Sequence, residues 1–320
     1  MKAAVAPTDE RWAEFLAEHT HLTEANFWRP TPSGQFKVVQ SGEPFLFKTK
    51  AKKSGRIFRR WLPNQIVGGG FYQGYEVFSI GEAWTLFGKG NGVASLDELI
   101  GRIAQFRSDH VDANSQIGCI LLRNIFFMPP HRALRQPDDF ASNLTGPKGY
   151  DLSTTGRHVD LMFDTMLREA EIRWGDHHRP PLEGAGPVEF RERLTSVRLG
   201  QQAFKGRVLT SYGRRCAITG NHIVPTLEAA HIRPVTKGGE HRLDNGLLLR
   251  SDVHTLFDQG FLGINERFEL QVSPLLRENW GNGKEFYEMA GSIIRLPAAK
   301  RNRPSRDSIE WHMDTTFRAR

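Results

Sequence analysis

Four polar residues in the C-terminal third of the chain have the types and the spacing of a metal-assisted hydrolytic site. They are His231, Asn245, His254 and Asp258. His254 and Asp258 are four residues apart, so on a helix both side chains project from one face. An imidazole and a carboxylate on one face are suitable donors for a divalent cation.

The surrounding sequence predicts the elements that must position these side chains. Residues 228–232 are short and apolar around one histidine, which predicts a strand entering the site. Residues 238–246 are rich in Gly, Asp and Asn and predict turns. Residues 247–249 are leucines that lead into a helix beginning at Ser251, with Asp252 in its first turn. A strand, a polar loop, a second apolar run and a helix therefore bring the candidate residues together.

Three motifs in this segment resemble one branch of the HNH (ββα-metal) nuclease family. They are AAHI at 229–232, DNG at 244–246 and HTLFDQG at 254–260. Upstream, RLGQQAF at 198–204 and YGRRCAITG at 212–220 are similar to the helix and first strand that lead into this branch. Three motifs in order are a much more specific signal than a lone His-x-x-x-Asp. The resemblance covers roughly residues 195–270 and implies a C-terminal HNH domain that hydrolyses phosphodiester bonds.

The resemblance implies a role for each residue of the site. His231 would be the general base that deprotonates water. Asn245 would tie down the loop and hold His231 through a hydrogen bond, without touching the metal. His254 would ligate the cation, which acts as a Lewis acid on the scissile phosphate. Asp258, one helical turn later, is a second candidate ligand; the alternative is a helix-capping or salt-bridging carboxylate.

The chain departs from the common family pattern just before the base. Many HNH nucleases have Asp or His there as a metal ligand, whereas this chain has Ala230. Glu228 lies two residues earlier and on a strand points to the same side, so we expect it to supply the missing ligand. Without Glu228, the metal would be held by His254, Asp258 and water. This donor set is compatible with Mg²⁺, our first candidate, and with Mn²⁺, Ni²⁺ or Zn²⁺.

Other residues near the motifs carry weaker signals. Arg233 and Lys237 are candidate contacts to the DNA backbone, although basic residues on loops are commonly only solvated. His222 and His241 flank the motif and are expected to be solvent-exposed loop residues. Cys216 lacks a partner cysteine at the CxxC spacing, which excludes the zinc ribbon that some HNH nucleases carry.

The N-terminal half predicts a small β-rich domain. Ser95 and Glu98 form a candidate capping box, and the glycine- and proline-rich segments between apolar runs favour turns. A small sheet that curls into a barrel, with helices at its rim, fits this order. The expected elements are helices over 8–19 and Ser95–Phe106, and strands over Phe36–Val39, Glu43–Lys48, Gln65–Val67, Phe71–Phe78 and Ile117–Phe127.

Four segments of this half resemble an EVE/PUA-like domain. They are FWRP at 27–30, PFLFK at 44–48, residues 66–88 and residues 117–130. The resemblance spans roughly residues 20–135 and implies a β-barrel that reads a modified cytosine by flipping it between aromatic side chains. The candidate pocket residues are Trp28, Trp84, Tyr72 and Tyr75. The candidate contacts to the DNA backbone are Arg56, Arg59 and Arg60, in a basic loop whose alternative is a solvated hairpin.

The whole sequence therefore predicts an α+β protein: a PUA-like (EVE-type) β-barrel with flanking helices, followed by an HNH ββα-metal nuclease domain. We assign residues 1–148 to the reader domain, 149–190 to a linker with a helix, and 191–320 to the nuclease domain with a basic C-terminal tail. The net charge of +7 and the pI near 9.5 suit a polyanionic partner. No apolar run approaches the length needed to cross a bilayer, and residues 1–12 lack the apolar core of a signal peptide. We therefore expect a cytoplasmic protein without a membrane partner.

These features predict a metal-dependent endonuclease for double-stranded DNA that contains 5-methyl- or 5-hydroxymethylcytosine, acting in defence against foreign DNA. Because one HNH site cuts one strand, a double-strand break implies a homodimer or two binding events. One alternative is an HNH endonuclease whose activity does not depend on a modified base. The other is a non-catalytic binding protein for modified DNA, with a decayed HNH site.

Overall fold

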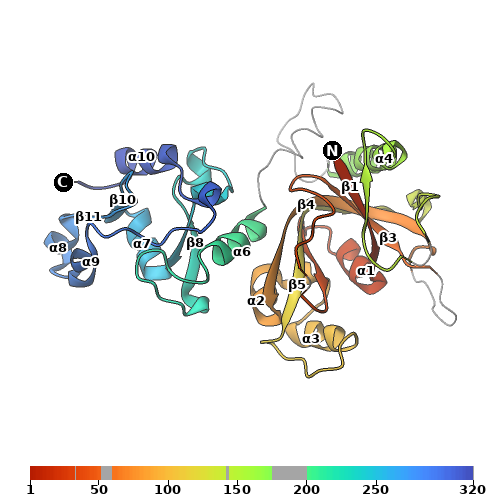
Figure 1. Cartoon of the computed structure of the whole chain (residues 1–320), viewed down its shortest axis with the longest axis horizontal. Coiled ribbons are helices and arrows are strands. Elements are labelled where there is room, and N and C mark those ends of the chain that lie inside the picture. The colour runs from red at the N-terminus through yellow and green to blue at the C-terminus, as the bar shows by residue number, and fades with distance from the viewer. Residues whose placement is uncertain (33, 52–59, 142–143, 175–199, 320) are drawn as a thin grey trace. The chain divides into compact units, whose positions relative to one another are not determined.

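The computed structural model of the chain describes residues 1–32, 34–51, 60–141, 144–174 and 200–319, apart from the side chains of 171–174 and 278–280. The chain divides into two compact units, Met1–Gly200 (unit 1) and Gln201–Arg320 (unit 2) (Figure 1). Both units mix helices and strands, so the protein is of the α+β class. Within the described residues, none of the helices is both long enough and apolar enough to span a membrane.

Unit 1 is built on one mixed sheet. Its strand order is β2-β5-β4-β3-β1-β7, and β6 pairs with β4 off this path. The β1–β3 pair is parallel, while the other pairs are antiparallel. The strands are β1 (Lys2–Thr8), β2 (Glu24–Arg29), β3 (Pro44–Thr49), β4 (Gln65–Ser79), β5 (Gln116–Phe127), β6 (Leu134–Arg135) and β7 (Lys148–Asp151). The helices are α1 (Glu10–Glu18), α2 (Ile80–Phe87), α3 (Leu96–Ala104) and α4 (Arg157–Trp174), with 3₁₀ turns η1 (Gly88–Asn91) and η2 (Pro130–Arg132).

The two faces of this sheet carry separate cores. Side chains of a strand alternate between faces, and on β1 Ala4 and Ala6 join one core while Ala3 and Val5 join the other. Residues of α1 pack in the first core, and residues of α4 pack in the second. The two helices therefore cover opposite faces of the sheet (Figure 1).

The helix α4 lies within the segment that the sequence analysis assigned to a linker. Its Phe163 is fully buried and packs edge-on against Phe71, with ring centroids 5.4 Å apart. Its Val159 and Met166 are also fully buried. Burying large apolar side chains of this kind contributes about 1.5–3 kcal/mol each, so α4 is an integral part of unit 1.

The expected closed barrel is not formed by strand pairing among the described residues. The sheet ends at β2 and β7, and no described pairing joins these two edges. Closure would require every edge strand to be paired. The turn η1 lies beside β2 instead, and Asn26 on β2 donates from Nδ2 to Oδ1 of Asn91 at 2.9 Å. Apolar alternation reveals the strands, but it does not reveal which edge strands meet.

Three local predictions for unit 1 also differ from the structure. Gln65–Val67 and Phe71–Phe78 are parts of one strand, β4, whose register shifts between Gly69 and Phe71. Gly68 allows β5 to pass closely, since a Cβ there would lie 2.2 Å from the carbonyl oxygen of Phe126. Phe36–Val39 is not a strand, and β1 and α2 were not predicted.

Unit 2 has a helix, a hairpin and a helix at its centre. The helix α6 (Gln201–Ser211) packs against the antiparallel pair β8 (Leu227–His231) and β9 (Gly246–Arg250), and α7 (Ser251–Asp258) follows β9 directly. The expected strand around His231 and the expected helix start at Ser251 are confirmed.

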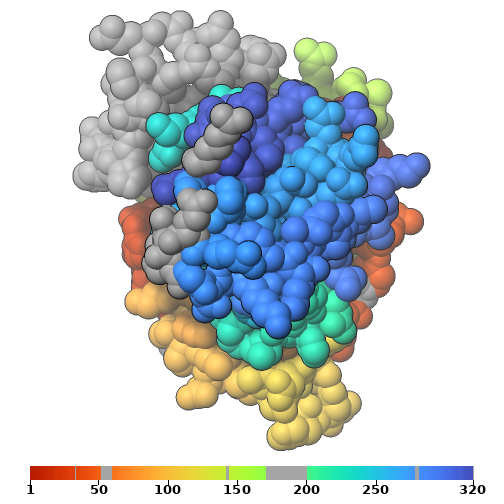
Figure 2. All heavy atoms as spheres, turned by 90° about the vertical axis from the view of Figure 1, so that its left-hand side faces the viewer, coloured from red at the N-terminus to blue at the C-terminus, as the bar shows by residue number. Residues whose placement is uncertain are grey.

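The remaining elements of unit 2 surround this centre, and the C-terminal ones form much of the face seen in Figure 2. They are the strands β10 (Leu262–Ile264) and β11 (Leu270–Val272), the helices α8 (Leu275–Trp280), α9 (Lys284–Met289) and α10 (Arg306–Thr315), and the 3₁₀ turns η3 (Val224–Thr226), η4 (Val235–Lys237), η5 (Leu243–Asn245) and η6 (Lys300–Asn302).

Candidate active site

His231 ends strand β8 and lies flat against an aromatic ring from α6. Its imidazole stacks on Phe204, with ring centroids 4.3 Å apart and an interplanar angle of 11°. The close approach depends on Gly246, which pairs with His231 across the hairpin. A Cβ at Gly246 would lie 3.0 Å from the Phe204 ring and 2.8 Å from Val208. The glycine of the DNG motif therefore makes room for the ring that orients His231.

The second partner of His231 is His241, which the sequence analysis expected to be an exposed loop residue. That expectation is wrong, because His241 is only partly exposed and its Nδ1 lies 2.9 Å from Nε2 of His231. Burial lowers the pKa of His241. Burial, together with the positive charges that His241 and His254 can carry, lowers the pKa of His231 to about 4. His231 is therefore neutral at pH 7, the form in which an imidazole can accept a proton.

Asn245 fastens the loop that follows His231. The side chain is 4% exposed, and its Oδ1 accepts a hydrogen bond from the backbone N–H of Arg233 at 2.9 Å. Its Nδ2 donates to the carbonyl oxygens of Arg233 and Glu240, both at 3.0 Å. Asn245 thus ties both ends of the loop to the start of β9, while the ring of His231 bonds to His241.

The second half of the site gathers three ionisable side chains. Nδ1 of His254 lies 2.6 Å from Oε2 of Glu228, and its Nε2 lies 3.3 Å from Oδ2 of Asp258. Both carboxylates are about half exposed, at 52% and 55%. Burial and the negative charge of Glu228 raise the pKa of Asp258, and the positive charge that His254 can carry opposes this. Ala230, at the position of the usual family ligand, is fully buried.

These three side chains fit a divalent cation in type but must rearrange to share one. The described part of the chain contains no ready-made group of three or more His, Cys, Asp or Glu around a single ion position. The reason is geometric: the two carboxylates occupy opposite nitrogens of one imidazole, whose lone pairs diverge. An ion bound to His254 would meet Glu228 on the Nδ1 side or Asp258 on the Nε2 side. Imidazole and carboxylate donors with open water positions suit Mg²⁺, Mn²⁺ and their neighbours.

Basic side chains lie close to this site. Arg233 donates from Nε to the carbonyl oxygen of Lys237 at 2.8 Å, and its guanidinium lies 5.5 Å from the ring centroid of Trp311. Lys237 is exposed. The N–H of Ser305 donates to the carbonyl oxygen of Asp244 at 2.7 Å, which fixes the C-terminal segment 300–306 beside the DNG motif.

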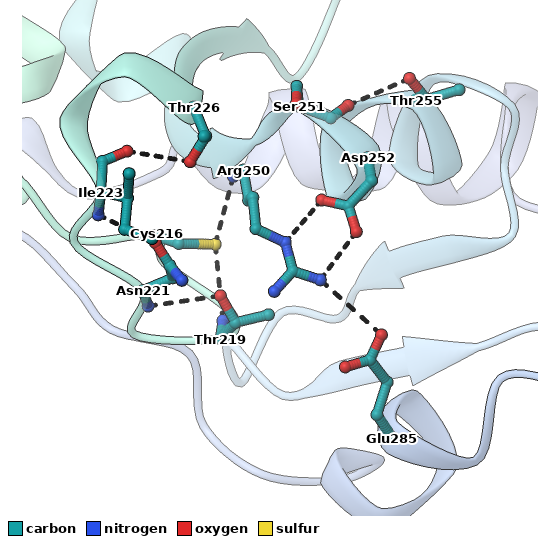
Figure 3. Close-up of polar contacts among 10 residues, drawn as sticks. All are labelled: Cys216, Thr219, Asn221, Ile223, Thr226, Arg250, Ser251, Asp252, Thr255 and Glu285. Carbon is teal, nitrogen blue, oxygen red and sulfur yellow. Dashed lines mark hydrogen bonds and ion pairs between the residues drawn. The ribbon is translucent and has the colours of Figure 1, made fainter.

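Cys216 closes the turn at the start of this region without a second cysteine. Its sulfur accepts N–H groups from Thr219 at 3.5 Å and from Arg250 at 3.4 Å (Figure 3). The guanidinium of Arg250 binds both carboxylate oxygens of Asp252 and lies 3.7 Å from Glu285. Hydrogen bonds and charge pairs therefore hold this turn and the start of α7.

The four candidate base-pocket residues of unit 1 have different surroundings. Trp28 is partly buried, donates from Nε1 to the carbonyl oxygen of Asn91 at 3.1 Å, and lies 6.2 Å from the ring of Phe106. Tyr72 is 6% exposed, and its ring centroid lies 5.3 Å from that of Phe36 in the core.

The other two candidates are partly buried. Tyr75 lies over Gly118, where a Cβ would meet its phenol oxygen at 2.3 Å. Trp84 is on α2. Of the basic-loop candidates, Arg60 lies 5.1 Å from the ring centroid of Trp61, while Arg56 and Arg59 fall outside the described residues.

Comparison with known proteins gives the class of the C-terminal region. The model of the family described as HNH endonuclease matches residues 216–265. This segment contains His231, Asn245, His254 and Asp258. No curated protein matches the sequence. One solved structure, a modification dependent TagI restriction endonuclease, aligns with a TM-score of 0.30 and 12% identity over 97% of this chain and 90% of that one. These values are too low to carry a functional argument.

Residues 216–265 are thus an HNH endonuclease domain, which includes strand β8 ending at His231 and helix α7 carrying His254 and Asp258. The chain is an endonuclease. An enzyme of this kind acts on DNA and generally needs a divalent metal ion.

Proposed function

We propose that the protein is a divalent-metal-dependent endonuclease that cleaves DNA containing modified cytosine, with unit 2 as the nuclease and unit 1 as the reader. The observation that carries the nuclease part is the grouping around His254. One imidazole contacts two half-exposed carboxylates, while a neutral histidine ends the same strand that bears Glu228.

In the proposed hydrolysis, the group around His231 and the group around His254 have different roles. His231 takes a proton from the attacking water at Nδ1. This nitrogen has no hydrogen-bond partner among the described residues and is not among the buried unpaired atoms. His254, with Glu228 or Asp258, holds the divalent ion, Mg²⁺ or Mn²⁺ in the first instance. When bound, the ion supplies Lewis-acid stabilisation of the phosphate and the leaving oxygen. Asn245 keeps the loop after His231 in place, and Arg233 and Lys237 supply positive charge toward the DNA backbone.

The reader function is proposed for the aromatic side chains of unit 1. A flipped base loses stacking worth a few kcal/mol and must regain it between aromatic faces. Trp28 supports this role best among the candidates, because it is partly exposed at the edge strand β2. Tyr72 supports it least, because its ring fills the core. A relationship to EVE/PUA-like domains, without closure of the sheet into a barrel, remains our proposal for this unit.

The decisive experiment compares matched plasmids that are unmodified, 5-methylcytosine-containing or 5-hydroxymethylcytosine-containing. The full chain is incubated with Mg²⁺ or Mn²⁺, with EDTA as the metal control. We expect cutting of modified DNA only, and we expect His231→Ala to abolish cutting while DNA binding persists. Equal cutting of all three plasmids would retain the nuclease and reject the reader. Absence of cutting with either metal would favour a binding protein with a decayed site.

In the same assay, Trp28→Ala tests the proposed reader function of unit 1 separately from the nuclease function of unit 2. It should lower the cutting rate on modified plasmid toward the rate on unmodified plasmid, without affecting metal binding. Trp84→Ala is the matched comparison, since both indoles are partly buried in unit 1. An unchanged preference in both variants would remove these residues from the pocket.

A double-strand break needs two strand cuts, so we propose that two copies of the chain act together on duplex DNA. Linear product should then increase more steeply with enzyme concentration than nicked product does. A first-order dependence for both products would argue for two independent binding events.

A further inference from the structure

His241 is a histidine of unit 2 that belongs neither to the proposed ligand set nor to the base assignment. His241 lies between Glu240, whose carbonyl oxygen is bound by Asn245, and Arg242, which pairs with Asp244. Its ring centroid is 4.9 Å from that of His231 and 5.5 Å from that of Phe204. Three aromatic rings from α6, β8 and the loop before β9 therefore form one cluster.

The loop is shaped to bring His241 to this position. Gly238 has a φ of 82°, a backbone conformation that side chains disfavour. A Cβ at Gly239 would lie 1.9 Å from the carbonyl oxygen of Arg233, so only glycine lets the chain fold back there. Asn245 then bonds to the backbone on both sides of this turn. The contact between the two histidines is thus held by the backbone of the loop.

The contact between the two rings links the position of the proton on one ring to the position of the proton on the other. Two neutral imidazoles can share a hydrogen bond only if one nitrogen carries the hydrogen and the other offers its lone pair. If Nε2 of His231 is the donor, its Nδ1 is unprotonated and available to water. If His241 donated instead, the hydrogen of a neutral His231 would be on Nδ1, and the base would be blocked. The direction of this one hydrogen bond therefore decides whether His231 can act.

We propose that His241 is a positioning residue for the base: it accepts the Nε2–H of His231 at its own Nδ1 and so holds the tautomer with a free Nδ1 lone pair. The inference rests on the proposed role of His231 and deepens it. The attacking water gives one proton to Nδ1 of His231, its oxygen bonds to phosphorus, and the bond from phosphorus to the 3′ oxygen breaks. The 3′ oxygen leaves with that electron pair and takes a proton from solvent. Nε2 of His231 keeps its hydrogen throughout and donates it to Nδ1 of His241.

Two substitutions separate the hydrogen bond from the packing. His241→Asn retains an acceptor oxygen near the position of Nδ1 but loses the ring. His241→Phe retains the ring against Phe204 but has no acceptor. With plasmid DNA and Mn²⁺, we expect kcat of the Phe variant to fall about 10- to 100-fold with KM unchanged. This is the range typical when the orienting partner of a metal-bound histidine is removed. We expect the Asn variant to recover most of the loss.

Nitrogen NMR of the full chain labelled with ¹⁵N-histidine gives a readout that does not depend on turnover. The His231 signals, assigned by their loss in His231→Ala, should report an unprotonated Nδ1 in the wild type and in the Asn variant, and a mixture in the Phe variant. Wild-type kcat in the Phe variant, or equal losses in both variants with unchanged nitrogen signals, would overturn the proposal. If His231→Ala still cuts DNA, the base assignment itself fails, which is a separate outcome.

Discussion

At the scale of the residue, His254 is the centre of the metal site that we propose. Its two nitrogens face Glu228 at 2.6 Å and Asp258 at 3.3 Å. An imidazole cannot present both carboxylates to one ion, so one of the two is the principal partner. The shorter contact and the place of Glu228 on the strand of the base favour Glu228.

We therefore expect Glu228→Gln to weaken Mn²⁺ binding by at least about tenfold, and Asp258→Asn to weaken it less. Titration calorimetry of each purified variant without DNA measures the difference. Glu285→Gln is the matched control, because Glu285 pairs with Arg250 away from His254. A larger effect for Asp258→Asn would assign the ion to the Nε2 side of His254.

At the scale of the element, the position of α7 depends on α10. His312 on α10 is 2% exposed, and its ring stacks on Phe257 of α7 with centroids 3.9 Å apart. Its Nε2 lies 3.1 Å from the carbonyl oxygen of Phe257, while its Nδ1 is buried without a partner. Burial lowers the pKa of His312 to about 4, and the hydrogen bond to Phe257 opposes this shift. The neutral imidazole is the form that holds the two helices together.

This burial makes the stability of unit 2 sensitive to acid. The unfolded chain takes up a proton at His312 near pH 6.5, whereas the folded chain does so only near pH 4. The stabilising contribution of neutral His312 to the free energy of unfolding is therefore complete above pH 6.5. It is lost as the pH falls toward 4, by about 1.4 kcal/mol per pH unit at most. His312→Gln can keep a donor to Phe257 without titrating, so its unfolding free energy should depend less on pH. Denaturant unfolding at pH 7 and pH 5 measures this, with the exposed His222→Gln as control. Equal pH slopes in wild type and His312→Gln would contradict the prediction.

The C-terminal segment 300–306 is a second element that lies beside the site. Ser305 bonds to Asp244, and the exposed side chains of Lys300 and Arg301 form no ion pair with the described residues. Replacing both by Ala should lower DNA affinity and reduce the slope of log K against log salt by about 1 to 2. Binding assays with a catalytically inactive His231→Ala background measure the slope. Lys284→Ala is the control, because Lys284 already pairs with Glu288. An equal change in the salt slope of this control would mean that Lys300 and Arg301 contribute only to the overall charge and do not contact DNA.

At the scale of the whole molecule, each of the two units has its own core. Units of this kind commonly unfold separately, so calorimetry should resolve two transitions. Ligands stabilise only the unit that binds them, so Mn²⁺ should raise the midpoint of one transition. Phe163→Ala leaves a cavity in the core of unit 1 and should lower the free energy of unfolding of that unit by about 3–5 kcal/mol. The midpoint of the other transition should fall accordingly. A single transition that responds to both changes would show that the units unfold together.

The local features of the site were predictable from the sequence, and the long-range ones were not. The His231 strand and the helix that carries His254 and Asp258 follow from short apolar runs, turn formers and i,i+4 spacing. His241 was misjudged because its burial depends on the backbone at Gly238 and Gly239. In unit 1, the parallel pairing of β1 with β3 and the open edge at β2 depend on contacts between distant segments. Periodicity along the chain contains no information on such contacts.

The sulfur of Cys216 has a practical consequence for how such an enzyme is controlled. The backbone N–H groups of Thr219 and Arg250 close a turn by donating to this sulfur, and we expect the turn to keep its shape without an ion (Figure 3). Removal of divalent ions should then stop cleavage reversibly, without unfolding the domain. A chelated sample would keep its structure through storage, and returning the ion would restart cutting without any refolding step.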